Sequence, residues 1–398
     1  MKKIVIISLS FLLAFTIFAS TILITPSTML YLLNWGEYID STLIEKFEKE
    51  YKCQVILETV TSSEAMYQKI TSKATPYDVA IPGDYMIHQL YREDYLKELD
   101  VNNTELTNLN NYKNLFVDDL SSLMSKYLVI DNQEFNSYYM PYFWGAYSII
   151  YSYKNKEVES TIKDNGFKCF FNRDLFSSKV KIGMYDTARW IVACYLMSQD
   201  KDPNVTSLDL KEENDISSDL QDEIIKALKE TQFDEFGNDS LKRNVANSTL
   251  DFCFTQLGDF FDTLSLSFNE GNDINFNIYV PKTTAAFFDG MVIPKTTQNY
   301  TLANEFINFM LDENNAYLNA TSIGYSPTLK SVVKKFNQAS ENNEIYYSND
   351  TTTMTYKEFL TNYPNYLDPI YNCDNVYMLK EKSQAYLTSC ETILNSLA

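Results

Sequence analysis

Three short segments of the sequence each place a carboxylate beside aromatic rings, directly after a predicted β-strand. These segments are Asn34–Tyr38, Pro82–Tyr85 and Tyr185–Trp190. A fourth acid, Asp289, follows two phenylalanines. A carboxylate supplies negative charge, and the face of an aromatic ring attracts a cation by roughly 0.5–2 kcal/mol per contact. Together these residue types predict a binding site for an organic cation.

The composition argues against several other kinds of site. The formal net charge is −20, which argues against a nucleic-acid partner because phosphate needs basic surface. The single histidine, His88, leaves little scope for histidine zinc sites or Ser-His-Asp triads. The 10 glycines form no phosphate-binding loop, and the six cysteines form no C-x-x-C motif. We therefore expect no cofactor and no metal.

The elements that would position these acids alternate between strand and helix at the start of the chain. Strands are predicted over 29–34, 54–60 and 78–81, and helices after Asp40, after Ser62 and over 86–96. This order predicts an α/β fold with a parallel sheet, and ligands bind such sheets beyond the carboxyl ends of the strands. Further strands are predicted over 180–184 and 290–293, and helices over 220–231 and 304–311. The polar stretches 200–247 and 337–353 are interpreted as solvated surface.

The N-terminus has the pattern of an export signal. Lys2 and Lys3 precede an uncharged apolar run from Ile4 to Ile24. These 21 residues would also suffice for a membrane span, which needs about 20. A cleaved signal and a retained membrane anchor both remain open. In either case we expect the rest of the chain to lie outside the cytoplasm, at the membrane face or in the periplasm.

Four motifs, two of which include segments described above, resemble those of a known family. They are similar, in order and spacing, to motifs of the spermidine/putrescine-binding proteins, the extracytoplasmic receptors of polyamine ABC importers, and the match runs from about residue 30 to 330. The motifs are Leu33–Tyr38, Tyr77–Tyr85, Pro141–Gly145 and Ile323–Pro327. The resemblance implies a two-lobed type II periplasmic-binding-protein fold with the ligand in a cleft between the lobes. It implies no enzymatic activity, since no bond is made or broken.

The length of 398 residues suits two domains, and no Gly/Ser linker separates them. Crossing strands should therefore join the lobes. We expect a signal peptide or membrane anchor over 1–28, one lobe over 29–148 and 289–334, and a second lobe over 149–288 and 335–398.

The resemblance also implies the ligand-binding residues. Positions that contact polyamine in the family are matched here by Trp35, Glu37, Tyr38, Tyr85 and Tyr325, and the acid that anchors an amine is matched by Asp289.

Other positions depart from the family pattern. Phe287 and Gln256 replace tryptophans, and Thr187–Trp190 lacks the two acids of the family's Asp-Ala-Arg-Glu segment. Asp186 is expected to substitute for a lost acid, and Asp84 to add charge. These departures leave the length of the ligand and its affinity open.

The sequence thus predicts a monomeric receptor that binds spermidine or putrescine and delivers it to an ABC permease. Three alternatives remain open. They are a receptor of the same fold for thiamine, a sugar or an iron complex; an exported glycoside hydrolase that uses two carboxylates; and a surface adhesin without a small ligand.

Overall fold

A mixed β-sheet runs through the centre of the protein. The computed structural model describes residues 28–396 except 132, 210, 212–214 and 350–352. The strands of the sheet are β1 (Thr28–Trp35), β2 (Cys53–Val60), β3 (Val79–Ala80), β4 (Leu96–Lys97), β7 (Tyr139–Ser152), β8 (Ile182–Tyr185), β9 (Glu235–Gly237), β10 (Phe252–Gln256), β11 (Phe276–Tyr279), β12 (Thr283–Pro294), β13 (Ser326–Pro327) and β16 (Asn375–Met378).

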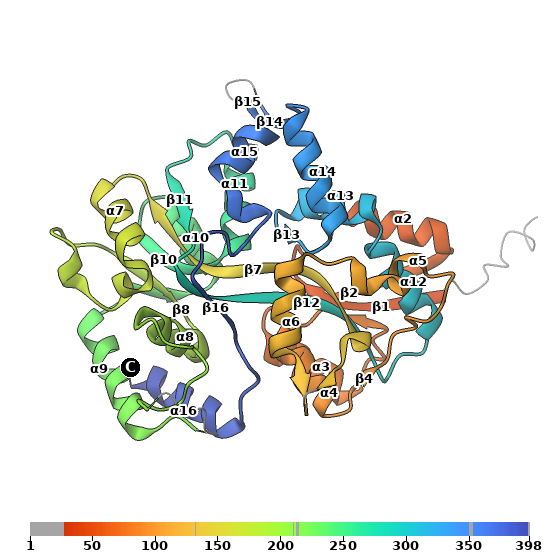
Figure 1. The fold of residues 1–398 in the computed structure, drawn as a ribbon, viewed down its shortest axis with the longest axis horizontal. Helices are drawn as coiled ribbons and strands as arrows, with labels where there is room; N and C mark the ends of the chain where they lie inside the picture. Colours follow the sequence, from red (N-terminus) through yellow and green to blue (C-terminus); the bar gives the residue numbers. More distant parts are fainter. Residues whose placement is uncertain (1–27, 132, 210, 212–214, 350–352, 397–398) are drawn as a thin grey trace, which may run out of the picture.

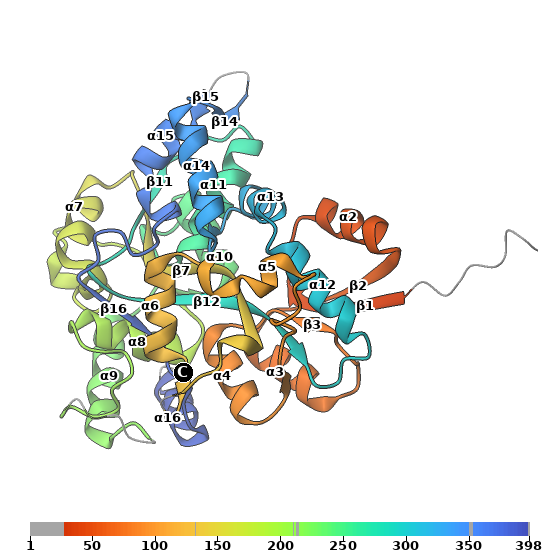
Figure 2. The same ribbon diagram turned by 45° about the vertical axis from the view of Figure 1, so that its right-hand side comes forward.

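Two long antiparallel strands, β7 and β12, join two halves of this sheet. The order is β2-β1-β3-β12-β7-β10-β8-β9. In the first half, β2, β1 and β3 are parallel, and in the second half β10, β8 and β9 are parallel. Figures 1 and 2 show α2–α6 gathered around the first half and α7–α9 around the second, with β7 and β12 between them. Crossing strands therefore connect the two halves, as the sequence predicted.

Helices cover both halves of the sheet. Their bounds are α2 (Ser41–Tyr51), α3 (Ser63–Ser72), α4 (Asp84–Arg92), α5 (Thr107–Asn110), α6 (Asp118–Tyr127), α7 (Lys156–Asn165), α8 (Ala188–Ser198), α9 (Ser218–Thr231), α10 (Asp239–Ala246), α11 (Leu257–Asn269), α12 (Tyr300–Met310), α13 (Glu313–Ile323), α14 (Lys330–Glu341), α15 (Tyr356–Asn362) and α16 (Gln384–Asn395). Near the C-terminus, β16 pairs with β12 and α16 packs against α8 and α9. A separate hairpin pairs β14 (Ile345–Ser348) with β15 (Thr353–Thr355), and another pairs β5 (Val129–Ile130) with β6 (Gln133–Glu134).

Local sequence signals explain the first two helices. The Asp40 carboxylate accepts a hydrogen bond from the Thr42 amide at 2.8 Å, and the Ser62 hydroxyl accepts one from the Ala65 amide at 3.1 Å. Both residues satisfy amides that would otherwise lack a partner at a helix N-terminus. The predicted strand–helix alternation of the first half is confirmed.

Some predicted boundaries were wrong. The helix predicted over 86–96 is α4, which begins at Asp84 and ends at Arg92. Asp94 then adopts a left-handed conformation with φ 64°, and Leu96 pairs with Pro294 in β4. The strand predicted over 290–293 is part of the much longer β12, with a bulge between Asp289 and Gly290. Tertiary pairing, which no local pattern reveals, extended this strand.

The predicted export segment falls almost entirely on residues 1–27, which lie outside the described residues. Thr28, which the sequence assigned to that segment, is the first residue of β1. In the described part of the chain, no helix is long and apolar enough to cross a bilayer.

The cysteines are free thiols, and five of the six are buried among core side chains. No group of three or more His, Cys, Asp or Glu residues in the described ranges is arranged to hold a metal ion.

Candidate functional site

Two acids, Asp84 and Asp289, come together where β12 passes the start of α4. An isolated bridge pairs Gly83 with Asp289, and the Gly290 amide donates to the Pro82 carbonyl at 2.9 Å. The side chain of Asp84 is 4% exposed and accepts hydrogen bonds from the Tyr85 and Phe288 amides, at 2.6 and 3.3 Å. Within the described residues, neither carboxylate forms an ion pair. We call Asp84 and Asp289 the acid pair.

Burial makes the charged form of the acid pair costly. It raises the pKa of Asp84 to about 7; the two amide hydrogen bonds lower it in part, and the charge of Asp289 raises it further. Burial likewise raises the pKa of Asp289 to about 7, with partial compensation from the Tyr38 hydroxyl. A buried carboxylate that lacks a counterion is stabilised by any cation that reaches it. The acid pair is therefore suited to an ammonium group.

Aromatic rings surround Asp289. The Tyr38 hydroxyl donates to its Oδ2 at 2.7 Å. The Tyr38 ring meets the Tyr325 ring edge-on, with centroids 4.9 Å apart, and also contacts Tyr142 and Phe143. Burial first, and then the charge of Asp289, raises the pKa of Tyr38 well above its ordinary value, so this phenol stays a donor. Apolar ring surfaces therefore lie next to the Asp289 carboxylate.

Trp35 and Tyr85 flank the acid pair from the first half of the sheet. The Trp35 indole donates from Nε1 to the Ile81 carbonyl at 2.8 Å, which fixes the ring beside the loop before α4. Tyr85 follows Asp84 in the first turn of α4. Trp35, Tyr85 and Asp289 therefore all lie near the loop that precedes α4.

The second half of the sheet meets this region through Arg189 of α8. Its guanidinium carbon lies 4.0 Å from the centroid of the Tyr85 ring, and its Nη2 donates to the Lys380 carbonyl. The side chain is 9% exposed. Its guanidinium stacks on Tyr85 and its charge lowers the pKa of Asp84 slightly. A buried cation already faces the acid pair from the opposite half.

Gln256 and Tyr325 belong to a second polar region at the carboxyl ends of β8 and β10. Gln256 caps α11, and its amide contacts both Asp259 Oδ2 at 3.2 Å and the Tyr185 hydroxyl at 3.3 Å. Tyr325 reaches this region because Gly258 leaves room for its ring. A Cβ at Gly258 would lie 2.2 Å from that ring.

Phe287 also packs its ring against a glycine, here on the crossing strands β7 and β12. It lies opposite Gly145 in β7, where a Cβ would come within 2.7 Å of its ring. The ring contacts Tyr147 at a centroid distance of 5.5 Å. Phe287 is buried, two residues before Asp289 on β12.

Glu37 and Asp186 are exposed, unlike the acid pair. Glu37 lies in the turn after β1 with φ 52°, and Asp186 follows β8, where its amide donates to the Gly237 carbonyl at 3.0 Å. Both occupy the predicted strand ends, but water surrounds their carboxylates.

A cavity with a volume of about 300 Å³ adjoins Asp84, whereas Asp289 does not line it. Asp84, Tyr85 and His88 line it from α4, and the segment 379–381 lines it from the side of α16. At one side of the cavity, the Glu381 carboxylate lies 2.9 Å from His88 Nδ1 and 2.5 Å from Arg92 Nη2. This volume lies in the range of small-molecule sites.

Sequence reasoning gave no functional weight to Arg189, Lys242 or Glu381. For Arg189 the sequence did contain a clue, because this positively charged residue lies within Tyr185–Trp190, a segment predicted to bind a cation. Lys242 lay in the polar stretch interpreted as solvated surface, yet its side chain is only 12% exposed. For Glu381 there was no signal, because its partners lie about 290 residues earlier in the chain.

Comparisons with known proteins identify relatives of this chain. The spermidine/putrescine-binding periplasmic protein 1 of Haemophilus influenzae is 27% identical over 327 residues, which cover 80% of this chain and 81% of that protein. The putrescine/cadaverine-binding protein of Pseudomonas aeruginosa is 24% identical and covers 81% of this chain and 84% of its own length. Both names describe binding proteins rather than enzymes.

A solved structure confirms the predicted fold. The spermidine/putrescine ABC transporter substrate-binding protein of Streptococcus pneumoniae superposes with a TM-score of 0.67 at 25% identity, over 93% of this chain and 98% of that one. A family model described as bacterial extracellular solute-binding protein matches residues 42–345. This match spans most of both halves of the sheet, and the chain belongs to the family of bacterial extracellular solute-binding proteins.

Proposed function

We propose that this chain is an extracytoplasmic polyamine receptor that binds putrescine or spermidine between its two halves and delivers it to an ABC permease. The acid pair is the observation that carries the proposal. It places a buried and a partly buried carboxylate beside aromatic rings, and neither carboxylate forms an ion pair within the described residues. A polyamine combines ammonium groups with methylene chains that suit these two surfaces. The names of the relatives support the same class of ligand.

The proposed lobes are residues 29–148 with 289–334, and 149–288 with 335–398. A ligand amine would contact the acid pair of the first lobe, and its methylenes would lie along Trp35, Tyr38, Tyr85 and Phe287. Contacts to both lobes favour the closed state, so closure reports occupancy to the permease. We place the protein at the extracytoplasmic face of the cell membrane or in the periplasm, and we expect it to be a monomer. If its N-terminal segment is retained, that segment would anchor it to the membrane.

Titration calorimetry tests the ligand class. Putrescine, spermidine, cadaverine, thiamine and maltose are titrated into the protein at pH 8. We expect heat from the polyamines and none from maltose. Heat from thiamine alone would contradict the proposal.

The variant Asp289→Asn tests the anchor. It keeps the acceptor for the Tyr38 hydroxyl but removes the charge. Loss of one partner in a buried charged pair costs about 2–5 kcal/mol, so polyamine affinity should fall at least 30-fold. The matched control is Asp222→Asn on the exposed face of α9, which should bind like the wild type. An unchanged affinity of the Asp289 variant would refute the anchor.

A further inference from the structure

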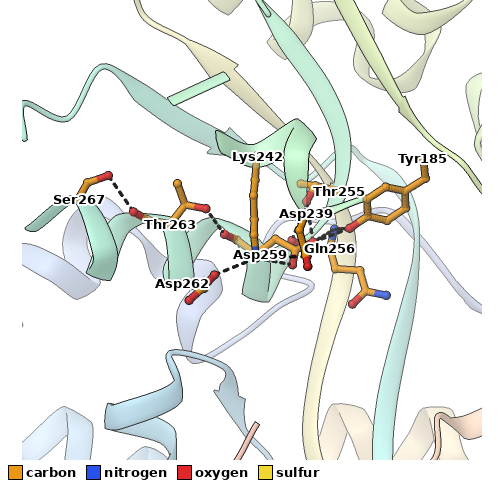
Figure 3. A network of polar contacts seen from close by, with 9 residues as sticks. All are labelled: Tyr185, Asp239, Lys242, Thr255, Gln256, Asp259, Asp262, Thr263 and Ser267. Atoms are coloured by element: carbon orange, nitrogen blue, oxygen red, sulfur yellow. Dashed lines mark hydrogen bonds and ion pairs between the residues drawn. The ribbon is translucent and has the colours of Figure 1, made fainter. Parts of the chain in front are cut away.

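Lys242 of α10 directs its ammonium group into a cluster of three carboxylates. Its Nζ lies 2.8 Å from Asp262, 3.4 Å from Asp259 and 3.7 Å from Asp239. The lysine side chain and that of Asp259 are each 12% exposed, whereas Asp239 is 73% exposed. Figure 3 shows the lysine descending from α10 to the first turn of α11, between Asp259 and Asp262. We call Lys242 and these three acids the lysine cluster.

Hydrogen bonds hold one acid of the lysine cluster, Asp259, in place. Asp259 Oδ2 accepts from the Tyr185 hydroxyl, from Thr255 Oγ1 at 2.8 Å and from the Gln256 amide at 3.2 Å. Burial alone would lower the pKa of Lys242, but the charges of the three acids outweigh it and raise the pKa above its ordinary value. The lysine is therefore an ammonium ion bound by three carboxylates, of which Asp259 is preorganised.

The position of the cluster connects it with the acid pair. Tyr185 ends β8 and Gln256 ends β10, so the cluster lies at the carboxyl edge of the second half, the edge at which open α/β sheets bind ligands. Tyr325 packs on Gly258, the residue before Asp259, and the same ring meets Tyr38, which bonds to Asp289. Both Asp259 and Asp289 raise the pKa of Tyr325, after burial. The contacting rings of Tyr325 and Tyr38 thus lie between two acidic sites.

The two acidic sites differ in one respect. The acid pair forms no ion pair among the described residues, whereas the lysine cluster already contains an ammonium group. We infer that Lys242 is a built-in substitute for a ligand ammonium, and that by filling the far site it makes the receptor select short diamines over longer triamines. This inference rests on the proposed function and names the ligand within the polyamine class.

The test compares the dissociation constants of putrescine and spermidine for the wild type and for Lys242→Ala. Removal of the lysine leaves a site of fixed carboxylates with space for an ammonium group. We expect the spermidine affinity to rise relative to that of putrescine by at least about tenfold, which corresponds to about 1.4 kcal/mol. Lys242→Arg, which retains the charge, should keep the preference of the wild type. An unchanged ratio in Lys242→Ala would overturn the inference.

Lys163 provides the matched control. Its Nζ lies 2.7 Å from Glu159 on α7 and its side chain is 50% exposed, so Lys163→Ala removes a comparable pair far from the lysine cluster. Its ratio of dissociation constants should equal that of the wild type. If Lys242→Ala does not fold, Lys242→Met keeps the methylene packing and should show the same change in ratio.

A second measurement does not depend on polyamine binding. Methylammonium chloride should raise the melting temperature of Lys242→Ala by about 2 °C or more above the effect of equimolar NaCl, because the cation binds the folded state alone. The rise should be at least about 2 °C smaller for the wild type and Lys163→Ala, in which methylammonium can bind only the acid pair. If the wild type binds no polyamine, the proposed function fails, and this measurement still decides whether the cluster is an ammonium site. A rise in Lys242→Ala no larger than that of the wild type would overturn the inference.

Discussion

Replacing Asp289 with asparagine should stabilise the ligand-free protein at pH 8, although it weakens ligand binding. Asparagine has nearly the same shape, and its carbonyl oxygen can accept the Tyr38 hydroxyl that now lies 2.7 Å from Oδ2. What the substitution removes is the negative charge of a partly buried carboxylate. The ligand-free wild type must either ionise this group at a cost or keep it protonated.

The size of the effect follows from the pKa. Burial raises the pKa of Asp289 from 3.8 to about 7 in the folded protein. A group whose pKa is raised on folding stabilises the folded state fully below about pH 4, and this contribution is lost as the pH rises through 7. At about 1.4 kcal/mol per pH unit, the ionised carboxylate costs at most about 4 kcal/mol at pH 8. Because Asp289 is partly exposed, we expect a gain of about 2–3 kcal/mol in the variant.

Urea unfolding followed by tryptophan fluorescence at pH 5, 6, 7 and 8 measures this gain. The free energy of unfolding of the wild type should fall with rising pH, and that of Asp289→Asn should fall less steeply. The control Asp222→Asn, an exposed acid on α9, should follow the wild type. Equal pH dependence in the wild type and Asp289→Asn, or a less stable variant at pH 8, would refute the argument that this carboxylate is buried at a cost.

Three further predictions follow from the same geometry. The acid pair has pKa values of about 7 and must ionise to hold an ammonium group. Polyamine affinity should therefore rise from pH 6 to pH 8, and binding should release protons. Calorimetry in two buffers of different ionisation enthalpy measures this release. Gly258→Ala should displace the Tyr325 ring, destabilise the protein by about 1–3 kcal/mol and weaken binding, whereas Gly36→Ala, with open space around its Cβ, should leave stability unchanged in thermal melts. Arg189→Ala removes the stacking on Tyr85 between the two halves, so X-ray scattering should report a larger radius of gyration for the ligand-free variant; an identical radius would show that other contacts hold the halves together.

Much of the first half of the fold could be predicted from local sequence. Asp40 and Ser62 cap helices where their residue types indicated, and β1 and β2 form within one or two residues of the predicted ranges. These elements depend on helix capping and on runs of branched apolar residues. Both signals lie within about ten consecutive residues, so the local sequence is enough to predict them. The crossing strand β7 was not predicted, because all 14 of its residues are buried and it therefore shows no alternation.

The sequence by itself determined the residue types of the candidate site and the strand ends that carry them. It supplied the acids, the rings and the motifs of the family, because these follow from order along the chain. Only the tertiary structure decided which charges are buried. It buried Asp84 and partly buried Asp289 while Glu37 and Asp186 stayed exposed, and it brought Lys242 from a polar surface stretch into three carboxylates. The physical reason is that desolvation and ion pairing depend on atoms from segments that are separated along the chain and meet only when the helices and strands of each half pack together.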